Sequence, residues 1–218
     1  MGEPAPPAWP APAPGALFVT VEGTDGTGKS TQSRLLAERL RAAGRKVVLT
    51  REPGGAEGAE AIRELLVTGE PGRWSAETEI LLFTAARRDH MERVIAPTLA
   101  RGAVVVCDRF VDSTRAYQGA ARPLVDTLHA LMIGREADVT LILDLAPQAA
   151  LARTAARDHG AEDRFERKGP AFQATLAEAF RAIAAEAPAR CRLIDADGTA
   201  EAIAARIDTA LAPWLEPA

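Results

Sequence analysis

Short apolar runs alternate with longer amphipathic stretches along most of the chain. Five runs lack the apolar–polar alternation of a half-exposed strand, which indicates strands buried on both faces. These predicted strands are 16–22, 47–49, 104–107, 139–144 and 191–194. The stretches between them have apolar residues at helical spacing, which predicts helices over 29–43, 57–67, 76–101, 123–134, 147–157, 170–187 and 199–211. Pro97 predicts a kink in the longest helix.

Strands that alternate with helices form a parallel sheet, because each helix returns the chain to the same edge. The sequence therefore predicts an α/β fold with a five-stranded parallel sheet and helices on both faces. Ligands bind at the carboxyl ends of such strands, so the loops of interest follow residues 22, 50, 107, 144 and 194. We expect one domain over 16–218, preceded by a disordered Pro/Ala-rich tail over 1–15.

Charge and cysteine content exclude several kinds of partner. The formal net charge of −4 provides no electrostatic footprint for nucleic acid, so no nucleic-acid partner is expected. No apolar stretch is long enough to span a bilayer, and the N-terminus lacks the basic and apolar regions of a signal peptide. Cys107 and Cys191 are read as reduced, buried thiols. We therefore expect a cytoplasmic protein without a membrane partner.

A phosphate-binding motif follows the first predicted strand. Residues 23–30 match G-x-x-x-x-G-K-[ST], and the glycines let the backbone approach an anion closely. Lys29 is expected to reach the β/γ-phosphates, and the Ser30 hydroxyl is expected to bind Mg²⁺. A chance glycine turn is the alternative, but the flanking strand and helix both favour ATP binding. The expected ATP-binding residues are Gly23, Thr24, Asp25, Gly26, Thr27, Gly28, Lys29, Ser30 and Thr31. The chain contains no asparagine, so the guanine-reading N-K-x-D motif is absent.

Charged residues follow two further strands. Asp108 follows the third strand, where an acid beside a phosphate loop typically serves the metal ion. Arg51 and Arg109 follow the second and third strands, so both are expected to face the loop. Two guanidinium groups there can bind a second phosphate bidentately. A turn-capping Asp and ordinary surface arginines are the alternative interpretations.

Two other patterns leave alternatives open. Phe83 and Arg87 share one helix face, which suits either a core Phe beside a surface Arg or a stacked, hydrogen-bonded base. The highly charged stretch 153–169 contains Arg153, Arg157 and Arg164. Such a stretch is either a solvated loop or a mobile lid that delivers arginine charge to a transferring phosphoryl group.

Five motifs together resemble the thymidylate kinase family, whose members phosphorylate dTMP with ATP. In this sequence they are Glu22–Thr31, Thr50–Gly55, Leu82–Arg87, Asp108–Gly119 and Glu162–Glu166. The resemblance covers about residues 16–212. It implies a P-loop kinase fold with a small lid at about 153–169, which transfers the γ-phosphoryl group of ATP to dTMP. It also implies Mg²⁺, the products dTDP and ADP, a role in dTTP synthesis, and a homodimer.

The resemblance implies a role for each matching residue. Lys29, Asp108 and Arg109 would act in catalysis, with Asp108 and Ser30 near Mg²⁺. Gly26 replaces an arginine that some members carry in the loop, and in the similar bacterial subgroup the lid supplies the missing charge. Arg157 and Arg164 are the best candidates for this role. Arg153 would lie near the adenine, and 197–199 would border the same pocket.

The implied acceptor site has distinct parts for phosphate, sugar and base. Arg51 and Arg109 would bind the dTMP phosphate, and Asp25 would accept a hydrogen bond from the sugar 3′-hydroxyl. Phe83 would stack on thymine, and Arg87 would donate to a thymine carbonyl oxygen. The remaining pocket residues would be Ser113, Thr114, Gln118 and Tyr117, the last of which would disfavour ribose. A kinase for another deoxynucleoside monophosphate and an ATP-binding switch or scaffold without kinase activity remain alternatives.

Overall fold

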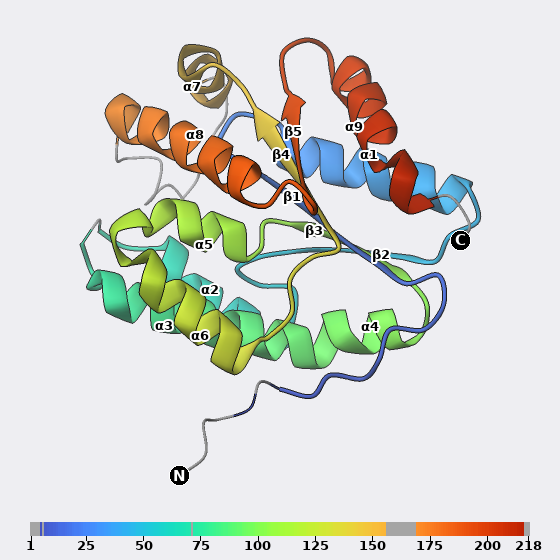
Figure 1. Cartoon of the computed structure of the whole chain (residues 1–218). Helices are drawn as coiled ribbons and strands as arrows, with labels where there is room; N and C mark the ends of the chain where they lie inside the picture. Colours follow the sequence, from blue (N-terminus) through green and yellow to red (C-terminus); the bar gives the residue numbers. More distant parts are fainter. Residues whose placement is uncertain (1–4, 6, 71, 156–168, 216–218) are drawn as a thin grey trace.

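A parallel β-sheet forms the centre of the molecule in the computed structural model, which describes residues 5, 7–70, 72–155 and 169–215 (Figure 1). The strands are β1 (Leu17–Gly23), β2 (Val47–Arg51), β3 (Val104–Asp108), β4 (Val139–Asp144) and β5 (Cys191–Asp195). They lie in the order β2-β3-β1-β4-β5, and every pairing is parallel. The predicted five-stranded parallel sheet is therefore confirmed, with strand ends within two residues of the prediction.

The central strand β1 shows how the sheet separates two apolar layers. All seven of its residues are buried between β3 and β4. Leu17, Val19 and Val21 pack in one core cluster, whereas Phe18 packs in another on the opposite face. Side chains alternate across a strand, so a continuous apolar run is what a strand covered on both faces requires.

Helices cover both faces, as the sequence predicted (Figure 1). On one face α1 (Lys29–Ala42) and α9 (Ala200–Leu215) pack beside each other, and α7 (Pro147–Ala155) adds Ala150 to the same cluster. The other face carries α3 (Ala76–His90), α4 (Ala96–Ala100), α5 (Val111–Tyr117), α6 (Arg122–Met132) and α8 (Gly169–Glu186). Helix α2 (Glu57–Val67) packs against α3. No helix in the described ranges is long and apolar enough to cross a membrane.

The long helical stretch 76–101 is interrupted before Pro97. A π-helical turn, Met91–Ile95, separates α3 from α4, and the Ala96 N–H donates to the Met91 carbonyl five residues earlier. Pro97 has no N–H to donate, so a wider turn before it is a local solution to the missing hydrogen bond. The predicted distortion is therefore present, but it lies in the residues before Pro97.

The described part of the N-terminal segment packs on the domain. The Trp9 indole N–H donates to the Ile133 carbonyl at 2.5 Å, and the Arg88 guanidinium lies 4.7 Å from the Trp9 ring centre. The Ala13 N–H donates to the Leu99 carbonyl at 3.0 Å. These contacts correct the expectation of a disordered tail for residues 7–15, which form a strap along the α4–α6 side (Figure 1). We call residues 7–15 the N-terminal strap.

Candidate active site

The loop between β1 and α1 has a backbone that only glycine accommodates easily. Gly23, Gly26 and Gly28 have φ values of 134°, 84° and 95°, all in the region that L side chains rarely adopt. A Cβ at Gly23 would lie 2.5 Å from the Leu143 carbonyl oxygen, and one at Gly26 would collide with the Ala150 backbone. The loop therefore packs tightly on β4 and α7 while it turns into α1. This conformation directs the N-terminus of α1 toward the carboxyl edge of the sheet.

Lys29 is buried at the start of α1. Its Nζ donates to the Thr24 carbonyl at 2.7 Å and lies 3.4 Å from Asp25 Oδ1. Burial and the neighbouring Arg109 charge lower the pKa of Lys29 to about 8, although Asp25, Asp108 and Glu22 oppose the shift. The ammonium group is thus held close to several charges without a full complement of water. Such a group gains strongly from an added anion.

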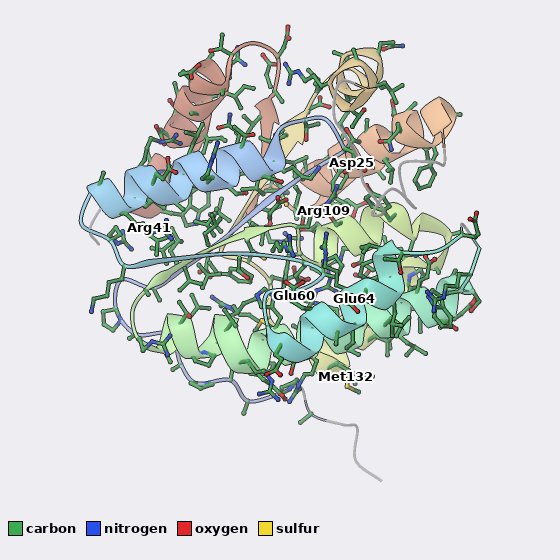
Figure 2. The ribbon with its side chains drawn as sticks, turned by 180° about the vertical axis from the view of Figure 1, so that it is seen from behind. Asp25, Arg41, Glu60, Glu64, Arg109 and Met132 are labelled. Atoms are coloured by element: carbon green, nitrogen blue, oxygen red, sulfur yellow. The ribbon has the colours of Figure 1, made fainter. Side chains whose placement is uncertain are left out.

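Asp25, Arg109 and Tyr117 form a hydrogen-bonded cluster beside the loop, and Figure 2 shows Asp25 and Arg109 near each other at the end of α1. Arg109 Nη2 donates to Asp25 Oδ1, and the Tyr117 hydroxyl donates to Asp25 Oδ2 at 3.0 Å. Burial alone would raise the pKa of Asp25, but Arg109 and Lys29 hold it well below its usual range. Asp25 is therefore a carboxylate whose two oxygens already accept hydrogen bonds.

Ser30 and Asp108 bring hydroxyl and carboxylate oxygens together. The Ser30 hydroxyl donates to Asp108 Oδ2 at 2.5 Å, whereas the buried Asp108 Oδ1 has no hydrogen-bond partner among the described residues. Mg²⁺ prefers such oxygen ligands and completes its shell with water and substrate phosphates. The donor set therefore fits a magnesium ion. Within the described residues, no three His, Cys, Asp or Glu side chains form a closed metal cage.

A cavity of about 540 Å³ joins these groups. Arg51 and Arg109 both line it, as their positions after the carboxyl ends of two parallel strands predicted. About half of the Arg51 side chain is exposed, and its Nη2 lies 3.2 Å from Glu60 Oε2. The full lining is Asp25, Gly26, Gly28, Lys29, Ser30, Thr31, Arg51, Glu52, Arg63, Asp108, Arg109 and Thr154. The cavity thus connects the phosphate loop to three arginines on other elements.

Arg87 is a buried residue with defined partners, which excludes the interpretation as a surface arginine. Its Nε donates to Glu52 Oε2 at 2.7 Å, and its Nη2 donates to Thr114 Oγ1 at 2.9 Å. Its guanidinium also lies 5.1 Å from the Phe110 ring centre. Arg87 and His90 lower the pKa of Glu52 despite its burial, so Glu52 is ionised. Phe83 is half-buried one helical turn before Arg87.

The other predicted pocket residues lie on or beside α5. Ser113 and Thr114 are buried within this helix, and Gln118 follows its end. Gln118 Nε2 donates to Glu79 Oε2 of α3 at 2.8 Å. These contacts tie α5 to the helix that carries Phe83 and Arg87. Residues from β1, α3 and α5 are therefore brought to one region although they are far apart in sequence.

Arg153 lies beside the segment 196–198. Its Nη1 donates to the Ala196 carbonyl at 3.1 Å, and its Nη2 lies 3.4 Å from the Gly198 carbonyl. Arg157, Arg164 and the motif Glu162–Glu166 lie outside the described residues. The same holds for most of the predicted lid.

Sequence reasoning assigned no role to three charged residues near the site. Glu22 is completely buried at the end of β1, and Glu52 is buried between Arg87 and His90. Arg63 of α2 lines the cavity and donates to the Pro53 carbonyl at 2.8 Å. The position of Glu22 at the end of a predicted apolar strand could have identified it as a residue near the site. Arg63 lies in a charged helix, and no sequence pattern distinguishes it from its charged neighbours.

The fold and the cavity define a class of protein. A glycine-rich loop joins a buried central strand to a helix, with an ammonium group, oxygen ligands and arginines around one cavity. These features are typical of a P-loop protein that binds nucleotide phosphates.

Comparisons with known proteins identify the family. The family model described as Thymidylate kinase matches residues 21–207. A thymidylate kinase from Ruegeria pomeroyi is 59% identical over 195 residues, covering 88% of this chain and 92% of that protein. One from Jannaschia sp. (strain CCS1) is 57% identical over 206 residues, covering 93% and 99%. The crystal structure of thymidylate kinase from Ehrlichia chaffeensis has a TM-score of 0.73 and 35% identity, covering 91% of this chain and all of that one.

This chain belongs to the thymidylate kinase family. It is an enzyme, a nucleoside monophosphate kinase with a P-loop kinase fold. Membership favours catalysis over the non-catalytic switch or scaffold that the sequence motifs left open.

Proposed function

We propose that this enzyme transfers the γ-phosphoryl group of ATP to dTMP, which gives dTDP and ADP for dTTP synthesis. The observation that carries the proposal is the single cavity that joins Lys29 to Arg51 and Arg109. One end suits the phosphates of ATP, and the arginine end suits an acceptor that already carries a phosphate. The names of the relatives support dTMP as that acceptor.

The ATP phosphates would bind at the loop and at the N-terminus of α1. Backbone N–H groups of a loop and a helix N-terminus favour an anion, and Lys29 would add a positive charge near the transferred group. Arg153 would border the adenine, which its contacts with the 196–198 segment support. These groups would neutralise the negative charge of the ATP phosphates. Phosphoryl transfer needs such charge neutralisation and positioning, and it needs no covalent bond between ATP and the protein.

Ser30 and Asp108 would hold Mg²⁺. The unpartnered Asp108 Oδ1 supports this role, since a buried carboxylate oxygen needs a proton donor or a cation. When bound, Mg²⁺ would neutralise phosphate charge and help to align the donor. The protein's part is to keep the two oxygen ligands in a fixed position beside the loop.

The acceptor would lie between α3 and α5. Arg51 and Arg109 would bind its phosphate, and Arg63 would add a third guanidinium to that part of the cavity. Asp25 would accept from the sugar hydroxyl in exchange for one of its present partners. Tyr117, which donates to Asp25, would restrict space beside the sugar.

Thymine would stack on Phe83 and accept a hydrogen bond from Arg87. Glu52 and Thr114 support this role because they fix the Arg87 guanidinium before substrate arrives. Ser113, Thr114 and Gln118 would complete the nucleoside pocket. A hydrogen-bond donor that is held in place before the substrate binds selects for a base with a matching acceptor. A base without that acceptor would leave the buried donor unpaired, which costs free energy.

We infer direct in-line transfer without a phosphorylated enzyme. The acceptor phosphate is already anionic, so alignment and charge neutralisation by Lys29 and the arginines would supply most of the rate enhancement. Arg157 and Arg164 would contribute charge from the lid. A contribution of arginine charge from the lid suits this site, because its phosphate loop has Gly26 in place of an arginine.

A homodimer would form through the helices on one side of the molecule. Leu65 of α2, Leu81 of α3, and Leu124 and Met132 of α6 are exposed, and these helices pack against one another. Figure 2 shows Met132 on the outer side of this layer. Exposed apolar side chains grouped on adjacent helices favour a protein interface. A cytoplasmic location is part of the same proposal, and the buried free thiols of Cys107 and Cys191 suit it.

The proposal is tested by ADP release from ATP and Mg²⁺ with each nucleoside monophosphate in turn. We expect turnover with dTMP far above that with dCMP, dGMP, dAMP or UMP. Arg109→Ala should raise the KM for dTMP by about tenfold or more, because it removes a charged hydrogen-bond donor. Arg41→Ala is the matched control, since Arg41 is exposed and donates to the Val47 carbonyl away from the cavity. Equal turnover with all acceptors would overturn the base assignment.

A further inference from the structure

Glu22 is the last residue but one of the central strand β1, and its carboxyl group is completely buried. Its Oε1 accepts from the Phe110 N–H at 2.7 Å, and its Oε2 accepts from the Ser113 hydroxyl at 2.5 Å. Both donors belong to the segment that directly follows Arg109. The carboxyl group does not line the cavity. Any effect of Glu22 on the reaction must therefore pass through residues that do.

The hydrogen bonds continue from Glu22 to Arg109. Ser113 Oγ, which donates to Glu22, accepts from Arg109 Nη1 at 3.0 Å. Arg109 Nη1 also lies 3.2 Å from the Gly23 carbonyl oxygen, next to Glu22 in the sequence. A short chain of hydrogen bonds thus links a carboxyl, a hydroxyl and the guanidinium that lines the cavity.

The backbone of Arg109 needs such support. Its φ of 70° makes it the one non-glycine residue with a positive φ in the described part of the chain. Residues in this region cost free energy and persist where neighbouring contacts hold them. The Arg109 N–H donates to the Val21 carbonyl at 3.0 Å, and the next N–H, that of Phe110, donates to Glu22. Strand β1 therefore holds the backbone on both sides of the Arg109 Cα.

We propose that Glu22 is a positioning residue, which holds Arg109 toward the cavity through the Phe110 N–H and the Ser113 hydroxyl. The inference rests on the proposed function, in which Arg109 binds the acceptor phosphate. It also gives Ser113 a second role, since its hydroxyl joins Glu22 to Arg109. The expected consequence of losing Glu22 is weaker acceptor binding with little change in ATP binding.

The electrostatic environment indicates how Glu22 acts. Burial, and then the nearby Asp112 carboxylate, raise the pKa of Glu22 to about 8, although Ser113 and Arg109 oppose the shift. Because this shift disfavours the charged form, hydrogen bonds rather than charge alone connect the carboxyl group to the Arg109 segment. A glutamine of the same size should replace it with little loss.

The test is a double-mutant cycle of Glu22→Ala and Arg109→Ala, read by calorimetric titration with dTMP. Glu22→Ala should weaken dTMP binding by about tenfold in the wild-type background and by less than about twofold in Arg109→Ala. The KM for ATP should change by less than about twofold. Glu22→Gln should restore most of the dTMP affinity. Equal weakening in both backgrounds would overturn the proposal, because Glu22 would then act independently of Arg109.

Asp138→Ala is the matched control. Asp138 Oδ2 accepts the Phe18 N–H at 2.8 Å, so this variant also removes a carboxyl that holds the backbone of the same strand, at its other end. It should leave dTMP affinity unchanged. If Glu22→Ala does not fold, Glu22→Asp replaces it in the cycle, because its shorter side chain cannot reach both the Phe110 N–H and the Ser113 hydroxyl. The same coupling to Arg109→Ala is expected, and additivity is the contrary result.

The outcomes separate the two proposals. If the wild-type enzyme does not bind dTMP, the proposed function fails and this inference fails with it. If the wild-type enzyme binds dTMP and Arg109→Ala weakens binding, the proposed function stands. In that case, additive effects of Glu22 and Arg109 would reject the positioning role alone.

Discussion

Three ionisable residues around the phosphate loop have pKa values displaced by different balances of the same forces. Burial raises the pKa of Glu22 and lowers that of Lys29, because both groups lose water around the charged form. For Asp25, the adjacent charges of Arg109 and Lys29 outweigh burial and lower the pKa. The site thus combines an acid with a raised pKa, an acid with a lowered pKa and an ammonium group with a lowered pKa between residues 22 and 29.

We expect ATP binding to be sensitive to alkaline pH because of Lys29. Its pKa of about 8 means that the free enzyme is charged there below pH 8 and loses this charge above it. We therefore expect kcat/KM for ATP to fall above about pH 8, because this parameter reports the free enzyme. The decrease of kcat with pH should occur at a higher pH than that of kcat/KM, because bound phosphates stabilise the charged form of Lys29. A pH profile of kcat/KM that stays flat to about pH 9.5 would contradict this account.

The sequence identified most cavity residues through the loop motif and through strand ends. Lys29, Ser30, Arg51, Asp108 and Arg109 lie around one cavity because parallel strands end at the same edge. Glu22 and Glu52 could not be assigned, because their partners come from α3 and α5, which are distant in sequence. The sequence shows that a residue is charged, but a local pattern does not show which buried hydrogen-bond donor lies beside it in the fold.

At the scale of elements, the strands were predicted more reliably than the short helix α5. The β-strands are apolar runs with clear ends, whereas α5 is seven residues long and buries Asp112, Ser113 and Thr114. A helix that buries polar residues lacks the apolar stripe by which helices are recognised. These polar residues face the site or buried partners, so α5 does not have the apolar stripe that would have predicted it.

The N-terminal strap is the element whose contribution to stability is most easily tested. Trp9→Ala removes a half-buried indole, its hydrogen bond to Ile133 and its contact with Arg88. We expect the free energy of unfolding in urea to fall by about 1–3 kcal/mol, with the KM values for ATP and dTMP unchanged. An unchanged unfolding free energy would show that the strap does not stabilise the domain.

At the scale of the whole molecule, the alternation of strands and helices predicted a parallel sheet covered on both faces. The strand order β2-β3-β1-β4-β5 was not predictable from that alternation, because it depends on which way each crossover runs. This order places the loop after β1 between the ends of β3 and β4. The phosphate loop therefore lies at the centre of the carboxyl edge, within reach of residues from both halves of the sheet.

The proposed dimer is tested by placing a charge on the exposed helical layer. Leu81→Glu on α3 alters a side chain that is 55% exposed, and we expect it to convert a dimer into a monomer in size-exclusion chromatography with light scattering. Leu193→Glu is the control, since Leu193 is 48% exposed on β5, away from α3. A monomeric wild-type protein, or equal dissociation by both variants, would contradict this interface.

Phosphoryl transfer from ATP to dTMP is best tested by following the transferred group itself. ATP labelled in its γ-phosphoryl group would be incubated with the enzyme, Mg²⁺ and dTMP, and the products separated by chromatography. We expect the label to appear in the β-phosphoryl group of dTDP, in amounts equal to the ADP formed, with none attached to the protein. Label recovered only as inorganic phosphate, or retained on the protein, would contradict direct transfer to dTMP.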